Sequence, residues 1–394
     1  MKILYYSAHP HLNLSATTGY GTHMREVIQG FKNLGHEVET LIIGGEEKLP
    51  KKQNSVHNSI FKKTLKKVIP SIIWETIKDI QLLKLDKSSE KILNAKILNF
   101  APDLIYERGY YLIESGIKNS KKHNIKHYLE LNAPYVEERV LFSGKSLLLS
   151  KAKKIELNQL KSVEKIIVVT SSLKDYFLKK ENQLNITVTP NAITSSKIKI
   201  NETNKNSIIK KHNLKNNLII GFVGSIFPYH GVDLLIKAFS KIALTKSNVK
   251  LLIVGDGEIL DELKKLSVEL NISKQIIFTG KVPHSEVFDY LATMDITVAA
   301  KAAWYNSPVK IFEYGYMEKS VIAPDYQAIK DVLSHRKNSL LIAPSVSNLI
   351  SSIEELIEDK ELRKQLASQL KIDILENHTW DKVAERILNF PPKL

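Results

Sequence analysis

The segment Ser307-Pro-Val-Lys-Ile-Phe-Glu313 contains residue types that suit a phosphorylated ligand. Serine and proline favour the first positions of a helix, so a helix is predicted over 309–318. Lys310 and Glu313 are three residues apart and therefore share one face of its first turn. The ammonium group could neutralise a diphosphate, and the carboxylate could accept hydrogen bonds from a ribose diol. A solvent-exposed Lys–Glu pair explains the same spacing, so this segment alone does not decide between the two.

The loop Gly224-Ser-Ile-Phe-Pro-Tyr-His-Gly231 is a second candidate, because it joins a β-rich apolar run to an amphipathic helix. The first N–H groups of a helix, together with its dipole, favour phosphate binding. The loop matches neither the P-loop nor the G-x-G-x-x-G pattern, so an ordinary strand-to-helix turn explains it equally well. The sequence has no H-E-x-x-H, EF-hand or G-x-S-x-G pattern, and no metal site is expected.

These two segments require strands and helices to position them, and the second half of the chain predicts both in alternation. Strands are predicted at 218–223, 251–254, 276–279, 296–299 and 320–323, and helices at 232–243, 258–270, 284–293, 309–318 and 347–357. This alternation predicts a parallel sheet with helices on both faces, in which ligands bind at the carboxyl ends of the strands.

The first half predicts the same architecture. It begins with a strand at 2–6, a polar loop at 15–22, a helix from about His23 to Leu34 and a strand at 38–43, and further strands follow at 104–107, 127–131, 166–170 and 186–189. The stretch 195–217 is rich in lysine and asparagine, has no apolar period and is predicted to link two doubly wound domains. Near the end of the chain, one helix face must pack on an apolar surface; it carries Trp380, Val383, Ala384 and Ile387.

The 394 residues include no cysteine, which excludes a disulfide scaffold, thiolate zinc sites and cysteine nucleophiles, and suits a reducing compartment. The net charge is +15, and nucleic acid, an anionic membrane and a phosphorylated substrate are the usual partners of so basic a chain. Only six of the 57 basic residues are arginine, whereas nucleic-acid readers favour arginine. Nucleic acid is therefore the least favoured partner, and biased coding stays open as an alternative explanation of part of the lysine excess.

More than half of this charge lies in 48–100, where twelve lysines and four acids give +8. Helical pieces are predicted around 60–67, 71–85 and 88–99. Two interpretations stay open: a solvated helical cap on the sheet, and a surface that meets anionic lipid. The N-terminus has no apolar signal region, and no apolar run approaches the length of a membrane span. A cytoplasmic protein is expected, either free or peripheral at the inner face of the membrane.

In combination, the motifs resemble those of family 4 retaining glycosyltransferases of GT-B fold. The resemblance is carried by the loop from Gly224, by Leu251-Leu-Ile-Val-Gly-Asp-Gly-Glu258, by Phe278-Thr-Gly-Lys-Val-Pro-His284 and by the segment 307–314. Gly35-His-Glu-Val38 and Pro190-Asn191 also fall in the order of that family. Each motif alone is weak, but together they cover nearly the whole chain.

The resemblance implies two facing, doubly wound Rossmann-like domains with an interdomain cleft. It implies an acceptor-binding domain over 1–193, completed by a C-terminal helix at 377–394, and a donor-binding domain over 194–376. The implied activity is metal-independent, retaining transfer of a hexose from a nucleoside diphosphate sugar, a UDP- or GDP-sugar, to a hydroxyl acceptor. It would act in cell-surface polysaccharide, glycolipid or natural-product glycoside synthesis, with no cofactor beyond the co-substrate and with a lipid-linked acceptor as one option.

The resemblance also implies roles for particular residues. Lys310 and His230 would meet the diphosphate, and Glu313 would bind the donor ribose. Further donor contacts would come from Gly19 and Gly21 in a loop that closes over the phosphate, from Val282 and Pro283 beside the base, and from Gly224, Ser225, Ser307, Pro308 and Val309. The acceptor-side candidates are Arg108, Glu130, Asn132 and Glu137.

Four positions depart from the family pattern. Many members have an acid where this chain has Tyr305, and basic residues where it has Ser225 and His230. Asn132 stands where relatives often carry a histidine, and an amide cannot act as a base. These departures, with the net charge, keep two alternatives open: a non-catalytic relative that binds sugar nucleotides, and a nucleic-acid-directed glycosyltransferase.

Overall fold

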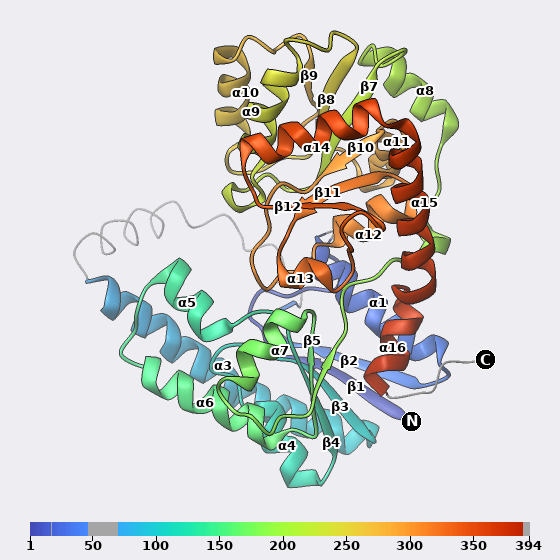
Figure 1. The fold of residues 1–394 in the computed structure, drawn as a ribbon. Helices are drawn as coiled ribbons and strands as arrows, with labels where there is room; N and C mark the ends of the chain where they lie inside the picture. Colours follow the sequence, from blue (N-terminus) through green and yellow to red (C-terminus); the bar gives the residue numbers. More distant parts are fainter. Residues whose placement is uncertain (17, 46–69, 389–394) are drawn as a thin grey trace, which may run out of the picture. The chain divides into compact units, whose positions relative to one another are not determined.

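The structure is a computed structural model that describes residues 1–16, 18–45 and 70–388. These residues form two compact units. Unit 1 contains Met1–Thr189 and the segment from Ala384 on, and unit 2 spans Pro190–Val383. Each unit contains a six-stranded parallel sheet with helices packed around it (Figure 1), which confirms the predicted pair of doubly wound α/β sheets.

The first unit ends a few residues before the predicted boundary at 193/194, and its return segment begins later than 377. A contact within unit 2 gives the reason. Ile193 forms a parallel bridge with Thr379, and its N–H donates a hydrogen bond to the His378 carbonyl at 3.0 Å. This pairing holds 190–193 and 377–383 in unit 2.

In unit 1 the strand order is β2-β1-β3-β4-β5-β6, so the order reverses between β1 and β3. The strands are β1 Lys2–Ser7, β2 Glu37–Ile42, β3 Leu104–Arg108, β4 Lys126–Leu131, β5 Lys165–Val168 and β6 Ile186–Val188. The helices are α1 Gly19–Asn33, α3 Ser71–Phe100, α4 Ser115–His123, α5 Tyr135–Ser143, α6 Leu149–Ser162 and α7 Ser171–Leu178. Tyr5 and Tyr6 on β1 and Tyr106 on β3 are fully buried and fill the core.

In unit 2 the strand order is β12-β11-β10-β7-β8-β9, which reverses between β7 and β10. The strands are β7 Leu218–Val223, β8 Val249–Val254, β9 Ile276–Phe278, β10 Ile296–Val298, β11 Ser320–Pro324 and β12 Leu340–Ile342. The helices are α8 Glu202–Lys211, α9 Val232–Ile242, α10 Leu260–Glu269, α11 Val287–Ala292, α12 Val309–Tyr316, α13 Gln327–Lys330, α14 Val346–Glu358 and α15 Lys360–Asn377. Helix α16 Trp380–Leu388 follows and belongs partly to each unit.

The predicted strands are confirmed to within two residues at each end. The predicted linker is wrong, because 195–217 contains α8. The Asn201 side chain caps this helix by accepting from the Asn204 N–H at 3.1 Å, and Ile208 is buried in the core. Asp289 accepts from both asparagines at 2.7 Å, so tertiary contacts order a segment whose sequence is polar.

Two further expectations about helices are wrong. The pieces predicted at 71–85 and 88–99 form one continuous helix, α3, while the piece predicted around 60–67 lies outside the described residues. Helix α1 begins at Gly19 instead of His23, so Gly19 and Gly21 lie in its first turn and not in a loop. A Cβ on Gly21 would meet the Ala16 carbonyl oxygen at 2.2 Å, and the absence of one lets the preceding chain pack against the helix.

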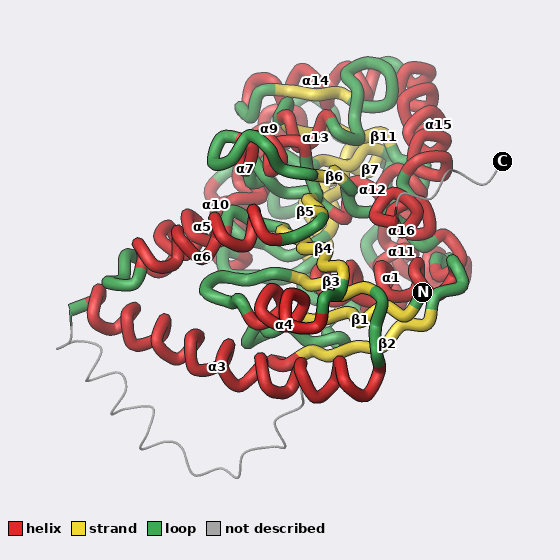
Figure 2. The backbone as a smooth tube through the Cα atoms, turned by 90° about the horizontal axis from the view of Figure 1, so that it is seen from below, coloured by secondary structure: helices red, strands yellow, loops and turns green. Residues whose placement is uncertain are grey.

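Figure 2 shows the helices of the described residues in red, with α3 along one side of unit 1. In none of them, the 30-residue α3 included, is there an apolar stretch that would reach across a bilayer.

Candidate functional site

The loops that follow β7 and β8 pack backbone against backbone in unit 2. Gly224 follows β7 directly and has a φ of +135°, a conformation that favours glycine. A Cβ on Gly255, which follows β8, would meet the Gly224 carbonyl oxygen at 2.0 Å. Ser225 is exposed beside this contact. Because the strand order reverses between β7 and β10, this edge of the sheet is where an open α/β sheet binds its ligand.

Helix α12 is fixed against the end of β7. The buried hydroxyl of Tyr314 accepts a hydrogen bond from the Val223 N–H at 2.9 Å. At the start of the helix, Asn191 donates from its N–H to Ser307 Oγ (3.0 Å) and from Nδ2 to the Ser307 carbonyl (2.6 Å). The segment 307–309 therefore begins the helix where the sequence predicts it, and both ends of its first two turns are held.

Lys310 lies in the first turn of α12, with its Nζ 4.0 Å from the centroid of the Phe222 ring. A Cβ built on Gly224 would be 3.1 Å from this Nζ, so the cation lies beside the β7 loop. Burial lowers the pKa of Lys310 to about 7, although the charge of Glu313 opposes this shift. Burial raises the pKa of Glu313 to about 7 against the effect of Lys310. A bound anion would stabilise the charged form of the lysine.

His230 ends the short 3₁₀ helix Pro228–His230 in the same loop. Its Nδ1 lies 2.6 Å from the Ser225 carbonyl and donates to it, which leaves Nε2 as an acceptor. Burial, followed by the nearby charge of Lys310, lowers the pKa of His230 to about 4. The histidine is therefore neutral at pH 7 in the free protein. Of Lys310, His230 and Glu313, only Lys310 can then carry a positive charge beside Gly224.

Val282 and Pro283 follow β9 at the same edge of the sheet. The β8 and β9 loops are joined by a hydrogen bond from the Gly255 N–H to the Gly280 carbonyl at 3.1 Å. Pro283 is exposed, and Val282 is half-buried against the core. The structure therefore brings Gly224, Ser225, His230, Lys310 and Glu313 into one neighbourhood, and puts 282–283 two loops away along the same sheet edge.

In unit 1 the predicted residues Arg108 and Glu130 form a buried ion pair at 3.0 Å. The Glu130 side chain is fully buried and accepts further contacts from Tyr106 OH at 2.7 Å and from His23 Nε2 at 2.7 Å. Asn132 Nδ2 donates to it as well. Burial would raise the pKa of Glu130, but His23 and Arg108 outweigh burial and hold it well below its usual range. A carboxylate with four partners is part of the scaffold.

The remaining acceptor-side candidates behave differently. Arg108 Nε and Asn132 Oδ1 are buried and have no hydrogen-bond partner among the described residues. Glu137 is exposed on α5 and pairs with Lys180 at 3.1 Å, so it is separate from the Glu130 cluster. Gly19 and Gly21 begin α1, where Arg25 donates to the Leu14 and Ala16 carbonyls at 2.6 and 2.7 Å and holds the preceding chain.

Sequence reasoning missed the residues that orient the site. Tyr314 follows Glu313 directly, so a helix puts it on a different face, toward the sheet. A buried tyrosine hydroxyl needs a polar partner. A tyrosine directly after Glu313 was therefore the sequence signal for a hydrogen bond that orients the helix. The contact between Asn191 and Ser307 spans 116 positions of the chain and leaves no local pattern.

Residues 204–372 match the model of the family Glycosyl transferases group 1. Among curated proteins, an uncharacterized glycosyltransferase of Methanocaldococcus jannaschii is 27% identical over 239 residues, 58% of this chain and 60% of that protein. The Saccharomyces cerevisiae phosphatidylinositol N-acetylglucosaminyltransferase subunit is 22% identical over 230 residues, 58% of this chain and 50% of that protein. A Salmonella typhimurium lipopolysaccharide 1,2-N-acetylglucosaminetransferase is 24% identical over 232 residues, 56% and 60% of the two chains. The match thus spans 50–60% of the length of these relatives.

Solved structures match over nearly the whole chain. The HepE protein of Anabaena in complex with UDP superposes with a TM-score of 0.75 at 16% identity, and covers 99% of both chains. Sucrose-phosphate synthase from Thermosynechococcus elongatus gives 0.71 at 15% identity, over 98% and 97% of the chains. With its two parallel six-stranded sheets, the chain has the two-domain α/β fold of GT-B glycosyltransferases, and its residues 204–372 are similar to the Glycosyl transferases group 1 domain.

Proposed function

We propose that the protein is a glycosyltransferase that moves a sugar from a nucleoside diphosphate sugar to a hydroxyl acceptor. The observation that carries the proposal is Lys310, a half-buried lysine beside the glycine loop of β7 whose pKa burial lowers to about 7. An anion that binds beside such a group stabilises its charged form and raises its pKa. The family match over 204–372 and the UDP bound to a structural neighbour support a nucleoside diphosphate as that anion.

In this proposal unit 2 binds the donor. Lys310 and the backbone at Gly224 and Ser225 bind the diphosphate, and neutral His230 accepts a hydrogen bond from a sugar hydroxyl through Nε2. Glu313, one turn along the same helix, accepts hydrogen bonds from the ribose, and the base lies near 282–283. The donor is a UDP-sugar, since the HepE neighbour binds UDP.

The proposed chemistry is metal-independent and retains the anomeric configuration. The acceptor oxygen forms a bond to the anomeric carbon on the face from which the diphosphate leaves. The bond between that carbon and the phosphate oxygen breaks with its electron pair, and the proton of the hydroxyl passes to the departing phosphate. Lys310 stabilises the charge that builds on the leaving group, which is where such enzymes gain most.

Unit 1 is proposed to bind the acceptor. Arg108 Nε and Asn132 Oδ1 are buried without a hydrogen-bond partner among the described residues, and they are proposed to serve as a donor and an acceptor for sugar hydroxyls once the acceptor binds, while Glu130 positions both residues. Glu137 is exposed and paired with Lys180, so the only role proposed for it is at the edge of the acceptor site. Two similar proteins are named for phosphatidylinositol and lipopolysaccharide acceptors, which supports a lipid-linked acceptor and work at the cytoplasmic face of a membrane.

A titration of the purified protein with UDP and GDP, followed by transfer assays with UDP-glucose, UDP-N-acetylglucosamine and GDP-mannose, tests the proposal. The expected result is UDP binding that Lys310→Ala weakens, with turnover of at least one donor. The matched control is Lys319→Ala, which removes a lysine three residues after the end of α12 and leaves its first turn intact. Absence of binding to either nucleotide and of turnover with every donor would sink the proposal.

A non-catalytic role in binding sugar nucleotides is the second candidate, and the neutral His230 together with Tyr305 favours it. This role predicts that the protein binds UDP but neither transfers nor hydrolyses the sugar of any donor, whichever acceptor is offered. A nucleic-acid-directed role predicts salt-dependent DNA binding instead. A gel-shift titration near physiological salt separates that role from the other two.

A further inference from the structure

The first half of helix α3 has its acids inside and its isoleucines outside, the reverse of an ordinary surface helix. Glu75 and Asp79 are 5% and 0% exposed, whereas Ile73 and Ile77 are 45% and 38% exposed, and Ile80 is 42% exposed. A helix of unit 1 that only covered the sheet would bury its isoleucines and leave its acids in water. The outward isoleucines therefore need an explanation outside the unit.

The inward acids near the start of α3 are fully used by the fold. Arg139 of α5 donates from Nη2 to Glu75 Oε2 at 2.7 Å and to Asp79 Oδ1 at 3.0 Å. Tyr111 OH donates to Asp79 Oδ2 at 3.0 Å, and Ser146 donates to the same carboxylate. These contacts fix the rotation of the helix, so the isoleucines on its opposite side cannot turn inward.

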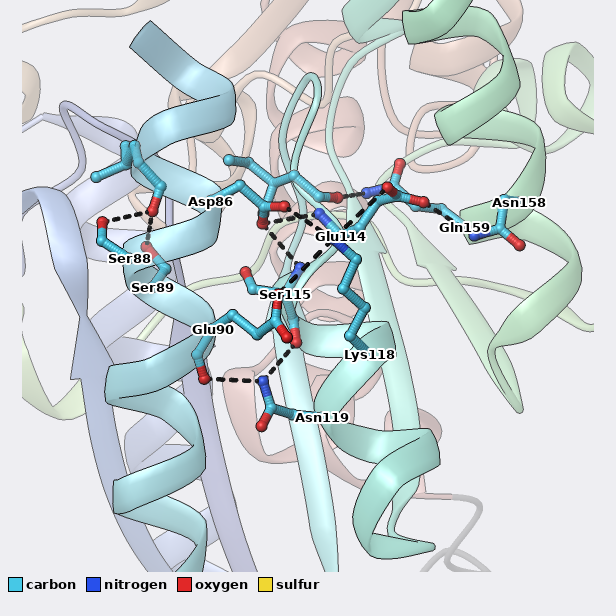
Figure 3. Close-up of polar contacts among 12 residues, drawn as sticks. Asp86, Ser88, Ser89, Glu90, Glu114, Ser115, Lys118, Asn119, Asn158 and Gln159 are labelled. Carbon is cyan, nitrogen blue, oxygen red and sulfur yellow. Dashed lines mark hydrogen bonds and ion pairs between the residues drawn. The ribbon is translucent and has the colours of Figure 1, made fainter. Parts of the chain in front are cut away.

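Two turns after Asp79, Asp86 has the same inward role. Figure 3 shows its carboxylate directed toward the start of α4, where Oδ1 accepts from the N–H groups of Glu114 (2.9 Å) and Ser115 (2.8 Å). Glu90, the fourth acid of α3, lies 3.8 Å from Lys118 of α4. All four acids of α3 thus serve contacts within unit 1, and its outward face is left to apolar and basic side chains.

The outward stripe follows the helical repeat. Its members recur at spacings of four and three residues and are all exposed: Ile73, Ile77, Ile80, Lys84, Lys87 and Lys91. Three isoleucines therefore continue into three lysines along one line of the helix surface.

A second element extends the apolar part of this stripe. Leu141 and Phe142 at the end of α5 are 78% and 68% exposed, and Leu147 in the next loop is 69% exposed. The Leu147 N–H donates to Thr76 Oγ1 at 2.9 Å, which holds this loop against the first turns of α3. Figure 2 shows these ends of α3 and α5 at the same edge of unit 1.

We propose that this α3–α5 face, made of the exposed isoleucines and lysines of α3 with Leu141, Phe142 and Leu147, docks on the surface of an anionic membrane. The apolar side chains would enter the boundary between headgroups and acyl chains, and the lysines would meet lipid phosphates. A second copy of the chain is a poorer occupant, because it would bring lysines to lysines while the acids of α3 stay engaged inside. The inference does not depend on sugar transfer.

Sedimentation with vesicles tests the proposal, using phosphatidylcholine alone and phosphatidylcholine mixed with phosphatidylglycerol. The full chain is expected to bind the anionic vesicles at least tenfold more tightly than the neutral ones, because each lysine at the surface contributes about fivefold to the affinity. This preference is expected to weaken as salt rises. The double variant Leu141→Ser/Phe142→Ser is expected to bind about tenfold or more weakly. Its matched control, Leu244→Ser/Val268→Ser, changes two equally exposed residues of unit 2 and is expected to bind as the parent does.

The charge component is tested by Lys84→Gln/Lys87→Gln/Lys91→Gln, with Lys241→Gln/Lys265→Gln/Lys274→Gln on exposed positions of unit 2 as control. Loss only in the α3 set supports the proposal. Equal losses in both sets would show that vesicle binding depends on net charge and not on the α3–α5 face, which would overturn the proposal. Absence of vesicle binding by the parent would also overturn it. A parent that dimerises through this face, with serine variants that are monomeric and no vesicle binding, would also overturn it. Unchanged UDP affinity in every variant keeps this result separate from the donor site.

Discussion

The two units both hold charged groups at the carboxyl ends of their central strands, but they treat the charge in opposite ways. Glu130 in unit 1 is fully buried and is contacted by Arg108, Tyr106, His23 and Asn132. Lys310 in unit 2 lies over the Phe222 ring and forms no ion pair within 4.0 Å among the described residues, although the nearby charge of Glu313 raises its pKa. The pKa of Glu130 is held low by its partners, while the pKa of Lys310 is lowered to about 7 by burial.

This difference separates structural charge from functional charge. A charge whose partners all come from the protein is already stabilised and adds to the rigidity of the fold. A charge that the protein desolvates without pairing is in a strained state that a ligand relieves. Unit 1 therefore uses its buried charge to hold strands β3 and β4 in position, whereas the charge in unit 2 is the one proposed to bind an anion.

The largest effect is expected from Glu130→Ala, which would leave Arg108 buried without its partner. The free energy of unfolding should fall by about 3–5 kcal/mol, because a lone buried cation is strongly unfavourable. Urea unfolding followed by circular dichroism measures it. Glu137→Ala, which removes an exposed carboxylate from unit 1, should change stability by less than about 1 kcal/mol. Equal effects of the two changes would remove the structural role assigned to Glu130.

Lys310→Ala should have the opposite profile. The rate of sugar transfer should fall by about 10²–10³-fold, because the cation facing the leaving diphosphate is lost. The free energy of unfolding should stay the same or rise, since a desolvated and unpaired charge is removed. The measurements are kcat/KM, donor affinity and urea unfolding of the same preparation. Equal losses in rate and in affinity would assign Lys310 to donor binding and not to the transition state.

The pH dependence of donor affinity follows from the pKa of about 7 for Lys310. A sugar nucleotide binds the protonated lysine better, so affinity for UDP-glucose should be full below pH 7 and decline above it. The decline should approach about tenfold per pH unit, the limit for one proton. In Glu313→Gln the midpoint should move to lower pH, because the charge of Glu313 raises the pKa of Lys310. Calorimetry from pH 6 to pH 9 measures both, and a flat profile would contradict the assignment.

The smallest effect is expected from Tyr314→Phe, which leaves the Val223 N–H without its acceptor. The free energy of unfolding should fall by about 1–2 kcal/mol. Because the tyrosine aligns α12 on β7, the same change should raise the KM for the donor. Tyr316→Phe is the control, since its hydroxyl reaches the Ser195 carbonyl only at 3.4 Å. A change in stability with an unaltered KM would make Tyr314 a packing residue only.

Much of unit 2 could be predicted from the sequence, because its strands are short apolar runs and its helices are amphipathic. The positions of Lys310 and Glu313 follow from helical spacing alone. The linker prediction was wrong, because α8 is ordered by Asp289 and not by an apolar period of its own. The roles of Glu130 and Tyr314 depend on partners from other strands, and no local pattern contains such contacts. Gly19 and Gly21 were expected in a loop because glycine is typical of loops, yet here it allows close packing at a helix start.

Unit 1 is built from two segments that are separated in the chain by unit 2, and this affects the order in which the units are completed during synthesis. Lys165 Nζ donates to the Ile387 carbonyl at 2.9 Å, and Ile387 is fully buried, so a segment made after the whole of unit 2 completes the first unit. On the ribosome, the unit whose synthesis begins first is therefore the last to be finished. While unit 2 emerges, the surface near Lys165 stays open, and this interval is when the nascent chain is most vulnerable to misassembly.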